Sequence, residues 1–141
     1  MKGKVVLITG ATSGIGEACA RKFASADASL ILNGRNREKL SALKDEFTKD
    51  GVETLLLPFD VMDRDAMKSA LDSLSGKWSE IDILINNAGL VYGTDKEFEG
   101  NLDEWDIMID TNIRALLSMT RLVVPGMVAR GRGHIINIGS I

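Results

Sequence analysis

The sequence predicts an α/β domain built on an open, doubly wound parallel sheet. Short runs rich in Val, Ile and Leu alternate along the chain with longer stretches whose apolar residues recur at helical spacing. Strands that helices bury on both faces have such continuous apolar runs, and their alternation with helices gives right-handed βαβ units. A glycine-rich turn after the first run marks the carboxyl edge, where sheets of this class bind ligands.

Five apolar runs are the expected strands, because their length and aliphatic content suit a buried parallel sheet. They are Val5–Thr9, Ser29–Leu32, Thr54–Pro58, Ile83–Asn86 and Ile135–Ile138. The last run would form an exposed hydrophobic edge of the visible sheet, and such an edge invites association with another chain.

Helices are expected between these runs, at roughly 14–26, 37–50, 63–77 and 103–130. Leu40, Leu43 and Phe47 recur at the spacing of one helical face, which predicts an amphipathic helix there. Asp63 is suited to be the N-cap of the third helix. Pro125 predicts a kink or an interruption in the last helix, because proline lacks the backbone N–H that a helix uses.

The composition is that of an ordinary globular chain with one domain, residues 1–141, of which 45% are hydrophobic and 26% charged. Lys and Arg number 17 against 20 Asp and Glu, so the chain lacks the basic excess of a nucleic-acid binder. No apolar run reaches the roughly 18 residues of a membrane span, and no signal-peptide pattern follows Met1. Cys19 is the single cysteine, so we expect a small core residue and a cytoplasmic protein.

The glycine-rich turn leads directly from the first expected strand into the first expected helix. Its spacing is Gly-x-x-x-Gly-x-Gly rather than the commoner Gly-x-Gly-x-x-Gly of dinucleotide sites. Gly10 would allow a sharp turn, Gly14 a close approach to a pyrophosphate, and Gly16 tight packing of the helix on the sheet. Backbone N–H groups and the helix dipole would hold the phosphate charge, although a turn that binds nothing is the alternative. The cofactor-binding residues expected in this Rossmann turn are Gly10, Thr12, Ser13, Gly14, Ile15 and Gly16.

The end of the second strand indicates which dinucleotide binds. NAD enzymes carry an Asp or Glu about 20 residues beyond the glycines, where it bonds the ribose hydroxyls. Residues 32–35 read Leu-Asn-Gly-Arg without a carboxylate, and Asp27 comes too early. Arg35 matches the 2′-phosphate of NADP, with Arg37 close enough to assist, whereas a merely solvated Arg35 would leave the missing acid unexplained. The sequence therefore predicts NADP.

Four further segments follow the glycine turn in a characteristic order. They are Asp60-Val61, Asn86-Asn87-Ala88-Gly89, Asn112 and Ile136-Asn137-Ile138-Gly139-Ser140. With the turn, they resemble the short-chain dehydrogenase/reductase family over the whole chain. Segments 106–112 and 134–140 are more similar to the branch that acts on serine and other 3-hydroxy acids. The resemblance implies an NADP-dependent oxidoreductase that transfers a hydride between nicotinamide and a small alcohol or carbonyl compound.

The resemblance also assigns cofactor-binding roles beyond the turn. Asp60 would bond the adenine amino group and Val61 would flank the ring, although Asp60 alone reads equally as an N-cap or a turn residue. Asn87, Ala88 and Gly89 would pass beside the cofactor ribose, although by themselves they are ordinary turn residues.

Two catalytic residues are implied in the same way. Asn112 would help to hold a water in a proton relay, and Ser140 would bond the substrate oxygen at the carboxyl end of the fifth strand. Taken alone, Asn112 reads as a polar surface residue of a helix and Ser140 as a turn residue. The family's Tyr, with a Lys four residues later, would follow Ser140, but the sequence ends at Ile141. We therefore expect the nucleotide-binding half of a longer polypeptide, truncated before the Tyr/Lys helix.

Tyr92 and Lys96 match the spacing Tyr-x-x-x-Lys, but they are not the expected catalytic pair. The pattern needs one helix face, while Gly-Thr-Asp between the two residues is poor helix material. We expect a loop that lines the pocket instead. His134 is the single histidine and no cluster of histidine and cysteine exists, so it is read as structural and no metal site is expected.

Two classes of function remain open: an NADP-dependent oxidoreductase with a small-molecule substrate, and a catalytically incomplete fragment that binds nucleotide or another protein. A flavodoxin-like or receiver domain shares the alternating pattern but leaves the glycine turn and Arg35 unexplained. The stretch Ala115–Val128 holds more apolar residues than one buried stripe requires. Because family members often pair through this helix, a homodimer or homotetramer is expected; burial within one subunit is the alternative.

Overall fold

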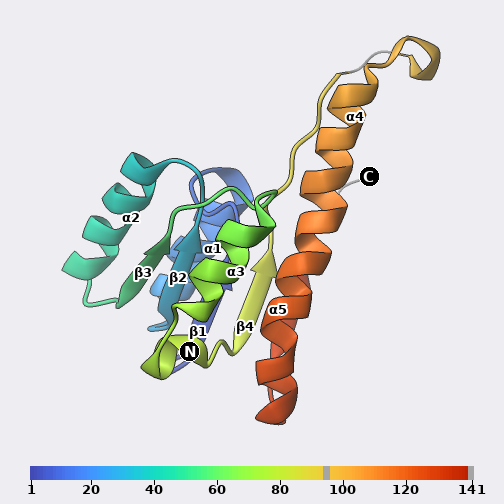
Figure 1. The fold of residues 1–141 in the computed structure, drawn as a ribbon. Helices are drawn as coiled ribbons and strands as arrows, with labels where there is room; N and C mark the ends of the chain where they lie inside the picture. Colours follow the sequence, from blue (N-terminus) through green and yellow to red (C-terminus); the bar gives the residue numbers. More distant parts are fainter. Residues whose placement is uncertain (94–95, 140–141) are drawn as a thin grey trace.

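The computed structural model describes residues 1–93 and 96–139, so Ser140 lies outside the described residues. The described part contains one parallel sheet in the order β3-β2-β1-β4-β5, with helices on both faces (Figure 1). The chain steps outward from β1 to β3 and then returns past β1 to β4, which is the predicted doubly wound arrangement. The strands are β1 (Val5–Ile8), β2 (Ser29–Asn33), β3 (Thr54–Leu57), β4 (Ile83–Asn86) and β5 (His134–Asn137).

The strands agree with the predicted ranges to within one residue at each end, and β5 forms an edge of the described sheet as expected. Along the chain, each α-helix lies between two successive strands, and both α4 and α5 lie between β4 and β5. The helices are α1 (Gly14–Ala24), α2 (Arg37–Lys49), α3 (Arg64–Asp72), α4 (Leu102–Ile109) and α5 (Ala115–Ala129), with a π-helical segment at Asp110–Arg114 and 3₁₀ turns at Gly76–Ser79 and Glu97–Glu99. No helix among residues 1–93 and 96–139 is long and apolar enough to cross a membrane.

Two helix predictions were wrong in detail. The third helix ends at Asp72 instead of residue 77. Ser75 has an extended backbone and Gly76 a left-handed φ of 55°, and neither conformation continues an α-helix. Pro125 does not interrupt the last helix, since α5 continues through it to Ala129, while the kink that was the other predicted effect stays a prediction. Pro125 and Arg121 are both exposed, so the Arg121 carbonyl that Pro125 leaves without its helical N–H partner belongs to the solvent-facing side of α5. The predicted N-cap is confirmed: Asp63 accepts a hydrogen bond from the Ala66 N–H at 2.9 Å.

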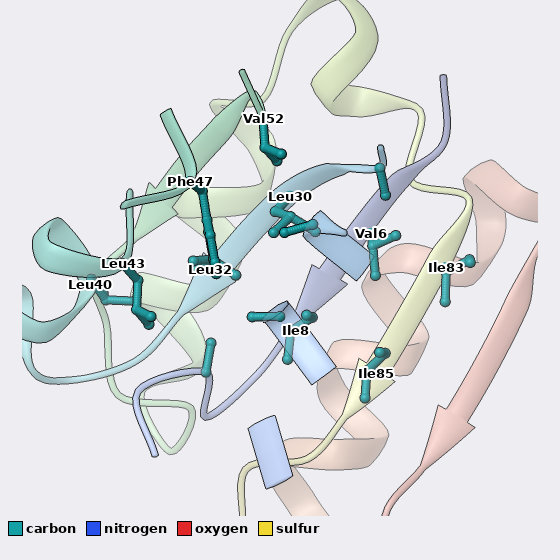
Figure 2. Packing of buried hydrophobic residues seen from close by; sticks show 14 residues of the cluster. Val6, Ile8, Leu30, Leu32, Leu40, Leu43, Phe47, Val52, Ile83 and Ile85 are labelled. Carbon is teal, nitrogen blue, oxygen red and sulfur yellow. The ribbon is translucent and has the colours of Figure 1, made fainter. Parts of the chain in front are cut away.

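The two faces of the sheet form separate cores, as alternate side chains of a strand must. On one face, α1 and α2 cover alternate strand residues that include Val6, Ile8 and Leu30 (Figure 2). The predicted stripe of α2 is buried there. On the other face, α3 and α5 cover Leu7 and Ile31. Helices cover both faces of the sheet, so a ligand can reach the ends of several strands together at the carboxyl edge.

The amino end of β4 carries a buried carboxylate, Asp82, that several groups from distant parts of the chain satisfy. It accepts hydrogen bonds from the Val5 backbone N–H at 3.1 Å, from Lys4 Nζ at 3.3 Å and from Arg132 Nε at 3.1 Å. Burial opposes ionisation and is the largest single influence on the pKa of Asp82. The bonds from Val5, Arg132 and Lys4 together outweigh burial and lower that pKa.

Replacing Asp82 by Asn should lower the free energy of unfolding at pH 7 by about 1–3 kcal/mol, because the Val5 N–H and both cations lose a buried charged partner. The folded-state pKa lies below the ordinary value of 3.8, so the carboxylate's contribution is complete above that pH. It is lost as the pH falls through the depressed folded-state value. Urea unfolding at neutral and acid pH should therefore show that the free energies of unfolding of the wild type and Asp82→Asn converge at low pH.

Glu80→Gln is the matched control, because Glu80 meets the same Arg132 side chain at 3.5 Å on the exposed surface. Its effect should stay within about 0.5 kcal/mol at pH 7. A wild-type advantage over Asp82→Asn that does not shrink in acid would contradict the role assigned to this carboxylate.

Candidate dinucleotide site at the carboxyl edge of the sheet

A cleft of about 1010 Å³ opens at the carboxyl edge of the sheet, where β1, β2, β4 and β5 end. It brings together predicted residues that lie far apart in the sequence. Those that line it are Gly10, Thr12, Ser13, Gly14, Ile15, Arg35, Asp60, Val61, Asn87, Ala88, Gly89 and Asn112. Gly16 is buried beneath the turn, and Gly139, next to the predicted Ser140, also lines the cleft.

Glycine is required at the three positions of the turn for different structural reasons. Gly10 and Gly14 adopt left-handed φ angles of 64° and 53°, which favour glycine. A Cβ on Gly16 would lie 2.9 Å from the Gly10 carbonyl carbon and closer still to the Gly10 oxygen and the Asn87 amide. Gly16 therefore lets the start of α1 pack against the turn and its Asn87 neighbour, at the end of the sheet that α1 covers.

The first turn of α1 borders the cleft through Gly14 and Ile15. Its N-cap residue, Ser13, makes no side-chain capping bond, whereas Asn36 caps α2 through a 2.9 Å bond to the Lys39 N–H. A Cβ placed on Gly14 would meet no described atom within 4 Å, so the space beside Gly14 is open. Open space and uncapped N–H groups at a helix N-terminus suit an anionic group such as a pyrophosphate.

Asn87 joins the turn after β4 to the turn after β1. Its side-chain amide donates to the carbonyls of Thr9 and Gly10, at 3.0 Å and 3.1 Å. In return, the Thr9 hydroxyl accepts the backbone N–H groups of Asn87 and Ala88, both at 3.0 Å. The Asn87 side chain thus fixes the glycine turn, while the backbone from Asn87 to Gly89 forms the wall of the cleft.

Arg35 and Asp60 lie beside each other at one end of the cleft, with Arg35 Nη1 3.6 Å from Asp60 Oδ2. The Arg35 side chain is 70% exposed and that of Asp60 34%, so the ion pair is weak and Arg35 is open to another anion. Asp60 also accepts the Met62 N–H at 3.0 Å. Of its two local interpretations, the structure supports the turn residue, because the N-cap of α3 is Asp63.

Asn112 lies in the π-helical segment and holds the same wall, formed by Asn87 to Gly89, where it continues to Leu90. Its Oδ1 accepts the Leu90 N–H at 2.9 Å, and its Nδ2 donates to the Leu90 carbonyl at 2.7 Å. Single π-turns inside helices frequently occur at functional sites. The structure thus gives Asn112 a positioning contact that the sequence did not predict, and the water-holding role remains a prediction.

Two buried asparagines at the strand ends were missed by the sequence analysis. Asn33 donates to the carbonyls of Leu57 and Phe59, at 2.9 Å and 3.1 Å. Asn86 donates to Thr120 Oγ1 at 3.0 Å and to Asn137 Oδ1 at 2.9 Å. The available signal was an amide residue at the end of an aliphatic run, where a buried polar group needs partners.

Tyr92 and Lys96 do not share a helix, as predicted, and Thr94 and Asp95 between them lie outside the described residues. Lys96 Nζ lies 5.6 Å from the centre of the Phe98 ring. The expected pocket lining comes from the preceding residues, since Leu90 and Val91 line the cleft while Tyr92 is 43% exposed.

A second groove, of about 400 Å³, lies between the start of α3 and the π-helical segment. Its charged lining includes Arg114, which pairs with Asp110 one helical turn away. None of the residues of the glycine turn lines it. Among residues 1–93 and 96–139 no group of three or more His, Cys, Asp or Glu side chains could hold a metal, and His134 is exposed at the start of β5.

Comparison with known proteins accounts for this arrangement. The family model described as short chain dehydrogenase matches residues 4–141. The chain belongs to this family. The order of its motifs and the five-stranded parallel sheet agree with that membership.

Similar proteins extend well beyond the matched region. The NADP-dependent 3-hydroxy acid dehydrogenase YdfG of Salmonella typhi is 48% identical over 136 residues, which are 96% of this chain and 54% of the relative. The crystal structure of serine dehydrogenase from Escherichia coli is similar with a TM-score of 0.91 and 46% identity, over 96% of this chain and 62% of that one. A metagenomic short-chain oxidoreductase in complex with NADP has a TM-score of 0.93 and 35% identity, over 100% of this chain and 64% of that one. The chain spans about half the length of the curated relatives it matches.

The tight packing of Gly16 predicts that Gly16→Ala destabilises the domain by about 1–3 kcal/mol, because the added methyl group overlaps backbone that cannot easily retreat. Chemical denaturation measures the loss. Gly139→Ala is the matched control, since neither glycine has a left-handed φ and a Cβ on Gly139 meets no atom of the described residues within 4 Å. Equal stability of the two variants would show that the turn is not packed as described.

Proposed function

We propose that the cleft binds NADP and that the chain is the nucleotide-binding half of an oxidoreductase. The single observation that carries the proposal is the open glycine turn with Arg35 at the end of β2, where an NAD enzyme would carry an acid. The names of the similar proteins, which specify NADP and 3-hydroxy acids or serine, support the same conclusion. We accordingly propose a small 3-hydroxy acid, such as serine, as the substrate.

The residues present fit the parts of this dinucleotide. Uncapped N–H groups at the start of α1 would hold the pyrophosphate in front of Gly14. Arg35 would exchange its weak ion pair with Asp60 for the 2′-phosphate, a stronger charge-assisted partner. Asp60 would then be free to accept a hydrogen bond from the adenine amino group, and the buried Val61 would flank the adenine ring.

The chemistry that the bound cofactor supplies is hydride transfer to or from the substrate carbon. The chain's own share is positioning at the nicotinamide end of the cleft. Asn112 holds the Leu90 wall and would help to retain a water for proton transfer, and Ser140 would bond the substrate oxygen just after β5. The Tyr and Lys that the family uses for the proton would come from the next helix of a longer polypeptide.

Self-association is proposed through the exposed side of the helical stretch Leu102–Ala129, which α4, the π-helical segment and α5 form together. Ile109, Ile113 and Leu117 recur every four residues and are 43%, 53% and 59% exposed, so they form an apolar stripe on one helical side. Such a stripe suits a homodimer or homotetramer better than a monomer. The proposed location is the cytoplasm, which the single, half-buried Cys19 suits.

Arg35→Ala should weaken NADP binding by roughly 10- to 100-fold, because a charge-assisted phosphate contact is lost. NAD has no 2′-phosphate, so its affinity should change by less than about 3-fold. Titration calorimetry with both dinucleotides measures the difference. Lys44→Ala on the exposed side of α2 is the charge-matched control and should change neither affinity. Equal losses for the two dinucleotides would overturn the assignment of Arg35 to the 2′-phosphate.

Turnover separates the oxidoreductase from the alternative of an incomplete binding fragment. The 141-residue chain should bind NADP but fail to oxidise serine, because it lacks the expected Tyr/Lys pair. A longer polypeptide that continues through the next helix should oxidise a 3-hydroxy acid with NADP, followed by the absorbance of NADPH. The proposed reaction fails if the longer protein binds NADP yet turns over no hydroxy acid, or if the short chain is fully active.

A further inference from the structure

The end of β2 leaves no room for a side chain at position 34. A Cβ on Gly34 would lie 2.8 Å from the Thr12 methyl carbon, 3.4 Å from the Thr12 hydroxyl and 3.7 Å from Leu40 Cδ2. Carbon atoms pack at about 3.5–4.0 Å, so the first of these distances is a clash. The Thr12 methyl group therefore occupies the space that the first carbon of any residue 34 would need.

Space, rather than backbone conformation, requires the glycine here. Gly34 has no left-handed φ, unlike Gly10 and Gly14 in the neighbouring turn. An Asp or Glu could adopt this backbone, and the contact under 3.0 Å that its Cβ would make is with the Thr12 methyl carbon.

Thr12 cannot easily move away from Gly34. The Ala11 N–H donates to the Asn33 carbonyl at 2.9 Å, which ties the glycine turn directly to the end of β2. Leu40, behind the pair, is fully buried (its place in the α2 face of the core is seen in Figure 2). Threonine is branched at Cβ and stiff about its first side-chain bond, so turning the methyl group aside is also unfavourable.

We propose that Thr12 is a specificity-determining residue that acts through Gly34 to exclude NAD-type recognition. Position 34 lies 20 residues beyond Gly14, where the ribose-binding acid of NAD sites is placed. By filling the Cβ position, Thr12 keeps a carboxylate out of the space beside the ribose 2′ position. That space stays open for a 2′-phosphate, and Arg35 follows Gly34 directly to meet it. The inference rests on the proposed binding of NADP.

A double-mutant cycle on the full 141-residue chain tests this coupling. Its four members are the wild type, Thr12→Ala, Gly34→Asp and the double variant, and calorimetry gives the affinity of each for NAD and NADP. Gly34→Asp alone should bind NADP at least tenfold more weakly and should gain nothing toward NAD. The double variant should bind NAD at least tenfold more tightly than Gly34→Asp does, because the carboxylate then reaches the ribose hydroxyls. The cycle removes any effect that Thr12→Ala has by itself.

The outcomes distinguish this inference from the proposed function. If the wild type prefers NADP but the two substitutions act additively on NAD affinity, Thr12 does not set the preference and only the inference fails. If the wild type binds neither dinucleotide, the proposed function and the inference fail together.

A cycle without nucleotide tests the contact itself and guards against a poorly folded Gly34→Asp. Gly34→Ala should lower the midpoint of thermal unfolding by several degrees when Thr12 is present, and by less than half as much in the Thr12→Ala background. Equal losses in the two backgrounds would show that Thr12 does not fill the space at position 34.

Discussion

The candidate site depends on the hydrogen bonds by which Asn87 joins the ends of β4 and β1. Through the carbonyls of Thr9 and Gly10, a single side-chain amide fixes the turn that faces the cleft. The same amide lies where a side chain on Gly16 would stand, so α1 can approach only because residue 16 is glycine. The direction of α1, and with it the aim of its free N–H groups, follows from this contact.

In the proposed account, cofactor choice is set at the neighbouring strand end, by sterics as well as by charge. Arg35 supplies the cation and is held only weakly by Asp60. Thr12 and Gly34 keep the adjacent space free of side chains, so the turn and β2 must be matched to each other. The proposed phosphate-binding turn and the proposed specificity position, Thr12 and Gly34, are 22 residues apart in sequence and would act as one local unit.

Much of this could be predicted from the sequence, because buried parallel strands have a strong aliphatic signal and the glycine spacing marks the ligand edge. The strand ranges followed from the aliphatic runs and the Asp63 cap from its place before a helical stretch, whereas the distant motifs expected at one cleft came from the family resemblance. The course of α5 through Pro125 did not, because the cost of a proline depends on whether solvent reaches the carbonyl left without a partner. The contacts of Asn87 and Asn112 with backbone carbonyls were also unforeseen, since side-chain partners depend on tertiary distances.

The central claim is that the carboxyl-edge cleft is a dinucleotide site that reads the 2′-phosphate. The most direct measurement is an amide NMR titration of the chain with NADP and, separately, with NAD. NADP should shift the resonances of residues 10–16, 34–36, 60–61 and 87–90, and NAD should leave those of residues 34–36 almost unchanged. Shifts confined to the groove beside Asp63 and Arg114, or identical shifts with both dinucleotides, would contradict it.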